Sequence, residues 1–489
     1  MRLLKDSAIY FSLSLGQKGI GFLLLPVYTA YLTPGDYGVV NAVGALVGLL
    51  QLLYPLGGDS ALARSYFPND RSSGSDHRRV WGSLLLFVIL VGGVCTVFLS
   101  LGSRWVLEPI MGGIAFWPFV FLGLIAALAG PVRTLYSTSL QIRERASEYL
   151  AIEGGFMLLR ILLMLVLVVG FHLSATGVLL SGAIAEGLFA LVSMWRFRRD
   201  VWWGIDRPIL RQTLGYSLPI VPHILAGWST TYLASLVLNS LQGTVQTGLY
   251  GLASTLAAVE SFLVGGFNQA FLPQVYAALA GGDPAEIERL NRRTLAAVAG
   301  FAIGGVALSL FSPEVLRLMT RPAYWPASEV IPLLVLAGVF QGVYSLYGHL
   351  LYYHPNGTRF LPLASGAGGI VSVALMFVLI PSYSIMGAAL AGCAGVLTRL
   401  VVAAAICNVR FSVPWSQGRL LALSVVGAVL VMIPSIIPVL GGGGWELLFP
   451  KALVFTGAAA VLWWLLPAAV RSEIIALVRA RLKSSTPSN

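Results

Sequence analysis

The sequence predicts an all-α membrane protein with about fourteen transmembrane helices. Of its 489 residues, 57% are hydrophobic and only 10% are charged, whereas about 25% of the residues in ordinary soluble domains are charged. The mean hydropathy is +0.83. The apolar residues also form runs long enough to cross the hydrocarbon core, which takes roughly 20 helical residues. The charged residues are too few to cover the surface of a soluble protein of this size. Most of the surface of this protein must therefore face lipid.

Fourteen apolar runs are long enough to span the membrane. They lie near 7–31, 37–58, 80–102, 115–140, 149–171, 175–195, 213–238, 247–272, 294–312, 327–352, 360–381, 386–408, 420–439 and 451–470. Helices are expected because backbone groups in lipid must be satisfied within their own segment. The first run is too long for a signal peptide and is interrupted by Lys18, so we interpret it as the first membrane helix.

The basic residues predict how the chain is oriented. An even number of spans places both termini on one side of the membrane. The loops on that side carry 23 Lys and Arg residues, and the opposite loops carry 4. By the positive-inside rule the richer side is cytoplasmic, and with it both termini. The net charge of +11 therefore indicates membrane topology, and no zinc spacing, arginine-rich tract or stacking-aromatic motif supports nucleic-acid binding.

A weak internal repeat predicts two lobes. The order of features in the first two spans returns in spans seven and eight, where Gly38 aligns with Gly248. Six spans separate the copies, so the two copies are parallel. We predict two six-helix lobes at 1–205 and 206–412, followed by two helices and a cytoplasmic tail at 413–489. The pair Gly57-Gly58 falls on Gly265-Gly266, which predicts a similar bend in both copies.

Charged residues at membrane depth are costly unless they face protein, water or a partner, so they are candidate functional residues. They are Lys18, Arg133, Glu153, Arg160 and Glu186 in the first lobe, and Glu260 and Arg399 in the second. The first lobe supplies most of the positive charge. A cationic cavity suits an anionic head group because arginine offers forked donors to phosphate oxygens. We therefore predict that Lys18, Arg133, Arg160 and Arg399 bind substrate.

Structural interpretations remain open beside the functional ones. Arg133 and Arg160 are equally consistent with cavity lining and with buried bridges, for example between Arg160 and Glu186. Glu153 lies near the predicted cytoplasmic end of its span, where an interfacial role suffices. Glu186 and Glu260 are candidates for ion coupling, although Glu260 could instead be a partner for Arg399.

Arg64, Asp59 and the two glycines before them end the second span in the run LGGDSALARSYF. Arg64 is a candidate for contacting a pyrophosphate at the mouth of the cavity, and an interfacial role is the alternative. The three cysteines lie in apolar runs without a CxxC spacing, so we expect neither disulfides nor a metal site.

The segment PVYTAYLTPGDYG at 26–38 resembles the connection between the first two helices of Wzx-type polysaccharide flippases. TGLYGLAS at 247–254 is similar to their eighth helix, and 144–169 to their fifth. The resemblance implies the multidrug/oligosaccharidyl-lipid/polysaccharide (MOP) superfamily, with two six-helix lobes around a cavity, a MATE-like fold. It also implies translocation of undecaprenyl-diphosphate-linked oligosaccharide across the bacterial inner membrane, alongside the polysaccharide assembly machinery.

Other functions stay open beside this one. A MATE-type drug/cation antiporter would favour acids at depth, and a peptidoglycan-precursor flippase would share the fold and the pyrophosphate. A membrane glycosyltransferase or polymerase is disfavoured because no DxD, GxSxG, metal cluster or large outer loop occurs. We therefore expect a transporter and not an enzyme, with no catalytic residues, no metal and no cofactor beyond an H+ or Na+ coupling ion. The partners expected are the lipid-linked saccharide and membrane lipid.

Overall fold

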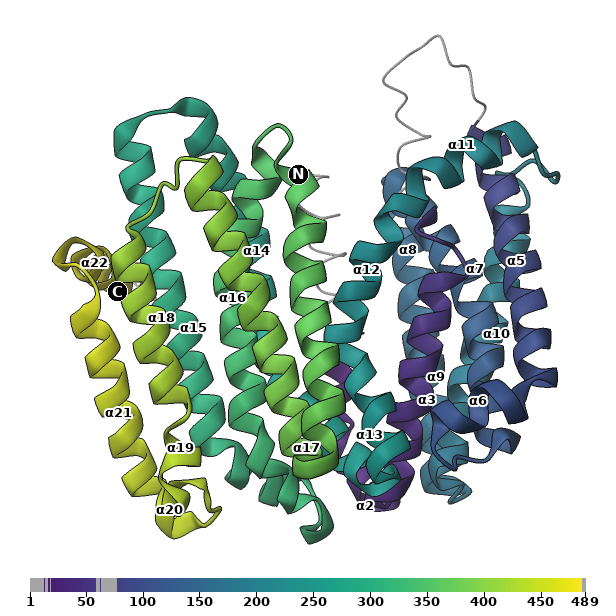
Figure 1. The fold of residues 1–489 in the computed structure, drawn as a ribbon, viewed down its shortest axis with the longest axis horizontal. Helices are drawn as coiled ribbons and strands as arrows, with labels where there is room; N and C mark the ends of the chain where they lie inside the picture. The colour runs from purple at the N-terminus through teal and green to yellow at the C-terminus, as the bar shows by residue number, and fades with distance from the viewer. Residues whose placement is uncertain (1–12, 14–15, 18, 59–61, 63–76, 486–489) are drawn as a thin grey trace. The chain divides into compact units, whose positions relative to one another are not determined.

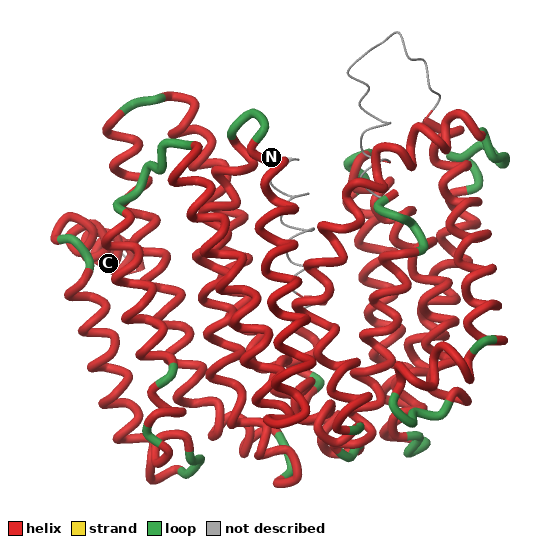
Figure 2. Tube along the Cα trace, viewed as in Figure 1, coloured by secondary structure: helices red, strands yellow, loops and turns green. Residues whose placement is uncertain are grey.

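The computed structural model describes residues 13, 16–17, 19–58, 62 and 77–485. Throughout these residues the chain consists of helices joined by short loops, and they include no strand (Figure 2). Ten helices in this part of the chain are long and apolar enough to cross a membrane. The prediction of an all-α membrane protein with many spans is therefore confirmed.

The count of fourteen spans stays a prediction. One long helix, α17 (Leu361–Arg410), contains two of the predicted spans, and its backbone leaves helical geometry between them at Ser384, where φ is 50°. The predicted span at 213–238 is divided among several short helices, and the one at 420–439 begins as the 15-residue α18 (Gln417–Val431). The start of the span predicted at 7–31 lies largely outside the described residues.

The chain forms two compact units. The first comprises Met1–Leu252 and Met376–Ala388, and the second comprises Ala253–Leu375 and Ala389–Asn489. The lobes predicted at 1–205 and 206–412, and the extension at 413–489, were inferred from the repeat and stay predictions.

The first unit is a bundle of helices packed around α7 and α10. Its helices are α2 (Leu25–Tyr31), α3 (Pro34–Leu53), α5 (His77–Leu101), α6 (Ser103–Met111), α7 (Phe121–Ile142), α8 (Ala146–Tyr149), α9 (Gly155–Met164), α10 (Ser174–Phe197), α11 (Arg207–Ser217), α12 (Val221–Trp228), α13 (Ala234–Gln242) and the start of α14 (Thr244–Gly281). The helices α3, α5 and α10 all pack against α7 (Figure 1). Buried Trp81, Leu135 and Phe197 belong to one apolar core that joins α5, α7 and α10.

The second unit is organised around α15. Its helices are the remainder of α14, then α15 (Pro284–Met319), α16 (Ile331–Tyr353), most of α17, α18, α19 (Ile433–Ile436), α20 (Pro438–Gly441), α21 (Leu448–Leu465) and α22 (Ala468–Ser485). The helices α16, α18 and α21 all pack against α15 (Figure 1).

The glycines that align in the repeat meet each other in the first unit. Thr33 caps α3 by accepting a hydrogen bond from the Asp36 backbone, and the Asp36 carboxylate accepts one from the Thr33 backbone, which is a capping box. One turn later, a Cβ on Gly38 would overlap the backbone oxygen of Thr244 at the start of α14. A Cβ on Gly248 would overlap the backbone oxygen of Pro34 in the same way. The two helix starts therefore cross backbone to backbone, in a reciprocal contact that only glycine permits.

The prediction of a shared bend after the second and eighth spans is wrong. In the first copy α3 ends at Leu53, and the backbone turns through Leu56 and Gly57, with φ values of 49° and 75°. In the second copy Gly265 and Gly266 lie inside the continuous helix α14. A pair of glycines permits a bend but does not impose one, because glycine is also tolerated within a helix that its neighbours hold.

A buried ion pair joins α15 to α21 in the second unit. The Lys451 ammonium is fully buried and donates to both carboxylate oxygens of Glu314, at 2.7 and 2.8 Å. It also donates to the carbonyl of Gly442 at 2.8 Å, and Glu314 accepts from the Gly444 backbone at 3.3 Å. Both charges are thus compensated, and the loop before α21 is held in place.

Lys451→Met is expected to destabilise the protein by about 3–5 kcal/mol because it leaves the Glu314 carboxylate buried and unpaired. The measurement is thermal unfolding of the purified protein in detergent. The double variant K451M/E314Q removes both charges and should recover most of the loss. A K451M variant that unfolds like the wild type would show that the pair does not hold α21.

Candidate functional site

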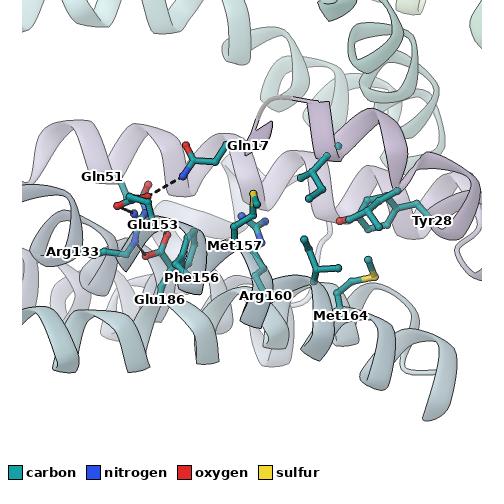
Figure 3. Close-up of a pocket in the computed structure, with 14 residues that line it drawn as sticks. Gln17, Tyr28, Gln51, Arg133, Glu153, Phe156, Met157, Arg160, Met164 and Glu186 are labelled. Atoms are coloured by element: carbon teal, nitrogen blue, oxygen red, sulfur yellow. Dashed lines mark hydrogen bonds and ion pairs between the residues drawn. The ribbon is translucent and has the colours of Figure 1, made fainter. Parts of the chain in front are cut away.

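A cavity of about 430 Å3 opens among helices of the first unit. Its walls come from the segment before α2, from α2 and α3, and from α7, α9 and α10. The lining residues are Gln17, Ile20, Gly21, Leu24, Tyr28, Gln51, Arg133, Glu153, Phe156, Met157, Arg160, Ile161, Met164 and Glu186. Figure 3 shows the charged cluster at one end of this cavity and Tyr28 and Met164 at the other, with Arg160 between them. Charged, neutral polar and apolar side chains therefore share one space, of a size typical of ligand pockets.

Arg133 of α7 is bound by two carboxylates at one end of the cavity. Its Nε and Nη2 donate to the two oxygens of Glu186 on α10, at 2.9 and 3.2 Å. Its Nη1 donates to Glu153, and its guanidinium lies 4.0 Å from the ring centre of Phe156. The side chains of these three charged residues are only 7–11% exposed. Arg133 is therefore fully engaged within the protein.

The second carboxylate of this cluster is further fixed by neutral donors. Ser137, one turn after Arg133 on α7, donates to Glu153 at 2.6 Å, and Gln17 donates to its other oxygen at 3.0 Å. Glu153 lies in a π-helical turn, Leu150–Gly154, which interrupts the regular spacing just before α9. Such turns are frequent at functional sites because they redirect a side chain without ending the helix.

Arg160 has a different environment. It lines the same cavity from α9, its side chain is exposed, and it makes no ion pair with any residue that the structure describes. Met157 and Met164 flank it on α9, and Tyr28 lies toward the far end of the space (Figure 3). The donors of the Arg160 guanidinium are thus available in the cavity, since no described acidic residue pairs with them.

The structure brings together three of the residues predicted from sequence. Arg133, Arg160 and Glu186 line one cavity, but Glu186 pairs with Arg133 and not with Arg160. Glu153, for which an interfacial role was sufficient, is buried and belongs to the same cluster. Lys18 and Arg64 lie outside the described residues. Whether these residues bind substrate or couple an ion stays a prediction.

The two candidates in the second unit, Glu260 and Arg399, have different neighbours. The guanidinium of Arg399 on α17 lies 4.5 Å from the ring centre of Tyr344 on α16, and its Nε is buried without a hydrogen bond. Glu260 on α14 is fully buried against Gly304 and Gly338, and neither carboxylate oxygen has a hydrogen-bond partner among the described residues. The interpretation of Glu260 as a partner for Arg399 is therefore not supported by the contacts.

Sequence reasoning missed the neutral polar residues of the cavity. Gln17, Tyr28 and Gln51 all line it, and Gln51 donates to the Ala126 carbonyl at 3.1 Å. Gly130 makes room for this amide, because a Cβ there would overlap the Gln51 side chain. A glutamine within an apolar run was the available signal. Within the described residues, no group of three or more His, Cys, Asp or Glu side chains could hold a metal ion.

Comparison with known proteins gives a family and a fold. A family model described as polysaccharide biosynthesis protein matches residues 3–276, which is more than half of the chain. The probable multidrug resistance protein NorM of Agrobacterium fabrum (strain C58 / ATCC 33970) is 32% identical over 145 residues, or 29% of this chain and 31% of that protein. The chain thus matches less than a third of the length of this relative.

Solved structures extend the likeness to nearly the whole chain. The lipid II flippase MurJ in an inward closed conformation superposes with a TM-score of 0.71 and 12% identity, covering 94% of this chain and 98% of that chain. An inward-facing MATE family transporter of the MOP superfamily gives 0.65 and 16% identity, covering 85% and 98%. The predicted MATE-like fold is confirmed, and the two solved structures are those of a flippase and a transporter.

Proposed function

The chain belongs to the polysaccharide biosynthesis protein family, and we propose that it is a flippase for undecaprenyl-diphosphate-linked oligosaccharide. It would move this lipid across the bacterial inner membrane by alternating access, for the biosynthesis of O-antigen, capsule or exopolysaccharide. Both termini would lie in the cytoplasm. The partners are the lipid-linked saccharide, membrane lipid and the polysaccharide assembly machinery.

The observation that carries this proposal is the contrast between the two arginines of the cavity. Arg133 is engaged by two carboxylates, whereas Arg160 has no ion-pair partner among the described residues. A diphosphate would supply the oxygen acceptors that the Arg160 guanidinium lacks, and forked donors suit such a group. Gln17, Gln51 and Tyr28 add neutral polar groups of the kind that hydrogen-bond sugar hydroxyls.

The other predicted site residues would bind substrate or couple an ion. Arg399 would offer a second guanidinium without an ion pair within the described residues. Lys18 and Arg64 remain candidates from the sequence. Glu186 and Glu260 remain candidates for coupling to H+ or Na+. Glu186 is compensated by Arg133, whereas the buried Glu260 carboxylate has no hydrogen-bond partner among the described residues and must take up a proton or another cation.

Arg160→Glu is expected to abolish translocation, because it places a like charge where the diphosphate binds. The measurement is polymer export together with the amount of lipid-linked oligosaccharide left in the cytoplasmic leaflet. We expect export to fall at least 100-fold while the protein level in the membrane is unchanged.

Arg104→Glu is the matched control for this charge reversal, because Arg104 is exposed on α6 and does not line the cavity. Its export should equal that of the wild type. If the R160E protein exported polymer at the wild-type rate, Arg160 would not be part of the substrate-binding site.

A drug/cation antiporter is the second candidate. It is favoured by the cluster of two carboxylates around one arginine, and by the partial match to a probable multidrug resistance protein. Efflux of a cationic dye that stops in the E186Q variant would support it over the flippase. A peptidoglycan-precursor flippase would instead sustain growth of cells depleted of their own lipid II flippase, which we do not expect here.

A further inference from the structure

A second pocket lies in the first unit, where α7, α8 and α10 approach one another. Its volume is about 350 Å3. Tyr136 of α7 lines it, Arg145 and Glu148 contribute from the start of α8, and Trp195, Arg196 and Arg199 contribute from the end of α10. Three guanidinium groups therefore surround one space, which shares no residue with the cavity that contains Arg160.

The charges of this pocket are not balanced by its own acids. Arg145 is paired with Glu148 at 2.8 Å, and the remaining acid of the pocket, Asp200, is paired at 2.8 Å with Arg143, outside it. Arg196 and Arg199 are exposed and have no ion pair within the described part of the chain. Two cations are thus left for an external anion.

The surroundings indicate where this anion comes from. The apolar helix α10 ends at Phe197, and Trp195 just before its end is 56% exposed. An exposed indole next to arginines at the end of a transmembrane helix is typical of the interface between hydrocarbon and head groups. Basic pockets between the ends of transmembrane helices are also a known form of site for anionic lipid head groups.

We propose that this pocket binds the phosphate of an anionic phospholipid through Arg196 and Arg199. The acyl chains extend into the bilayer beside Trp195, and the phosphate lies between the two guanidinium groups. The site would anchor the ends of α7, α8 and α10 to the lipid surface. Lipid binding at this pocket does not depend on the transported substrate, so it can be tested separately from the flippase proposal.

The test is native mass spectrometry of the full-length protein with added phosphatidylglycerol or phosphatidylcholine. The wild type is expected to bind phosphatidylglycerol roughly 10- to 30-fold more tightly than phosphatidylcholine, from two basic residues near the head group. The double variant R196Q/R199Q should lose this preference. R198Q is the matched control, because Arg198 is exposed next to both residues but does not line the pocket, and it should keep the preference.

Three results would overturn the proposal. They are an unchanged preference in R196Q/R199Q, an equal loss in R198Q, and displacement of phosphatidylglycerol by inorganic phosphate at the same concentration, which would indicate a site for soluble anions. The charge-conserving variant R196K/R199K should retain most of the preference. It therefore separates loss of the site from loss of folding.

Discussion

Gly38→Leu is expected to prevent the first unit from folding, or to destabilise it by at least about 3 kcal/mol. The reason is the reciprocal crossing of α3 and α14, where any Cβ at Gly38 overlaps the backbone oxygen of Thr244. A backbone atom cannot rotate away as the end of a side chain can, so the helices would have to separate. The measurements are the yield of monodisperse protein and its thermal unfolding in detergent. Gly248→Leu should have the same effect, because a Cβ at Gly248 would overlap the backbone oxygen of Pro34.

Gly35→Ala is the control for this pair of variants. Gly35 lies one turn before Gly38 and faces the same residue, but a Cβ there would be 3.5 Å from the Thr244 hydroxyl, an ordinary contact. Its stability should match the wild type. A stable, well-folded G38L protein would show that the two helix starts do not need the close approach.

Arg133→Gln is expected to cost about 3–5 kcal/mol of stability, since it leaves Glu153 and Glu186 buried next to each other without their shared cation. Polymer export should be lost as well, because the cluster of Arg133, Glu153 and Glu186 forms one end of the cavity. The measurements are thermal unfolding and polymer export of the same preparation.

The triple variant R133Q/E153Q/E186Q separates the two effects. It removes all three charges and keeps hydrogen-bonding groups of similar size, so it should recover most of the stability. Restored stability without restored export would assign the cluster a role in transport as well as in structure. A single variant R133Q with wild-type stability would contradict the buried pairing.

The fold was largely predictable because the bilayer restricts a chain to few solutions. Long apolar runs marked the spans, and the repeat aligned Gly38 with Gly248 but did not predict that these two glycines would be in contact. Helix breaks were harder to predict. Gly57 lies in a turn that follows Pro55, which lacks the backbone N–H that would continue α3, whereas Gly265 follows Leu263 and Val264 within the continuous helix α14.

The site was predictable only by residue type and depth. The sequence identifies Arg133, Arg160 and Glu186 as charged residues at membrane depth. It does not predict which of them form ion pairs, because this depends on which helices are neighbours. Glu153 was underestimated because a π-helical turn, which the sequence does not reveal, directs it toward Arg133. Gln17, Tyr28 and Gln51 were missed because neutral polar residues in an apolar run are common and carry little signal.

The three charges of the Arg133 cluster enter the membrane one after another. Its three charges come from α7, from the turn before α9, and from α10, so the chain is synthesised with the cation first. A charged residue near the centre of a span costs about 2.5–3.5 kcal/mol when it enters the bilayer alone. Within this cluster the nascent chain is cationic after α7, neutral once Glu153 follows, and anionic once α10 completes it. The cost that Arg133 imposes on α7 is therefore offset only when the segments that carry Glu153 and Glu186 pack against it.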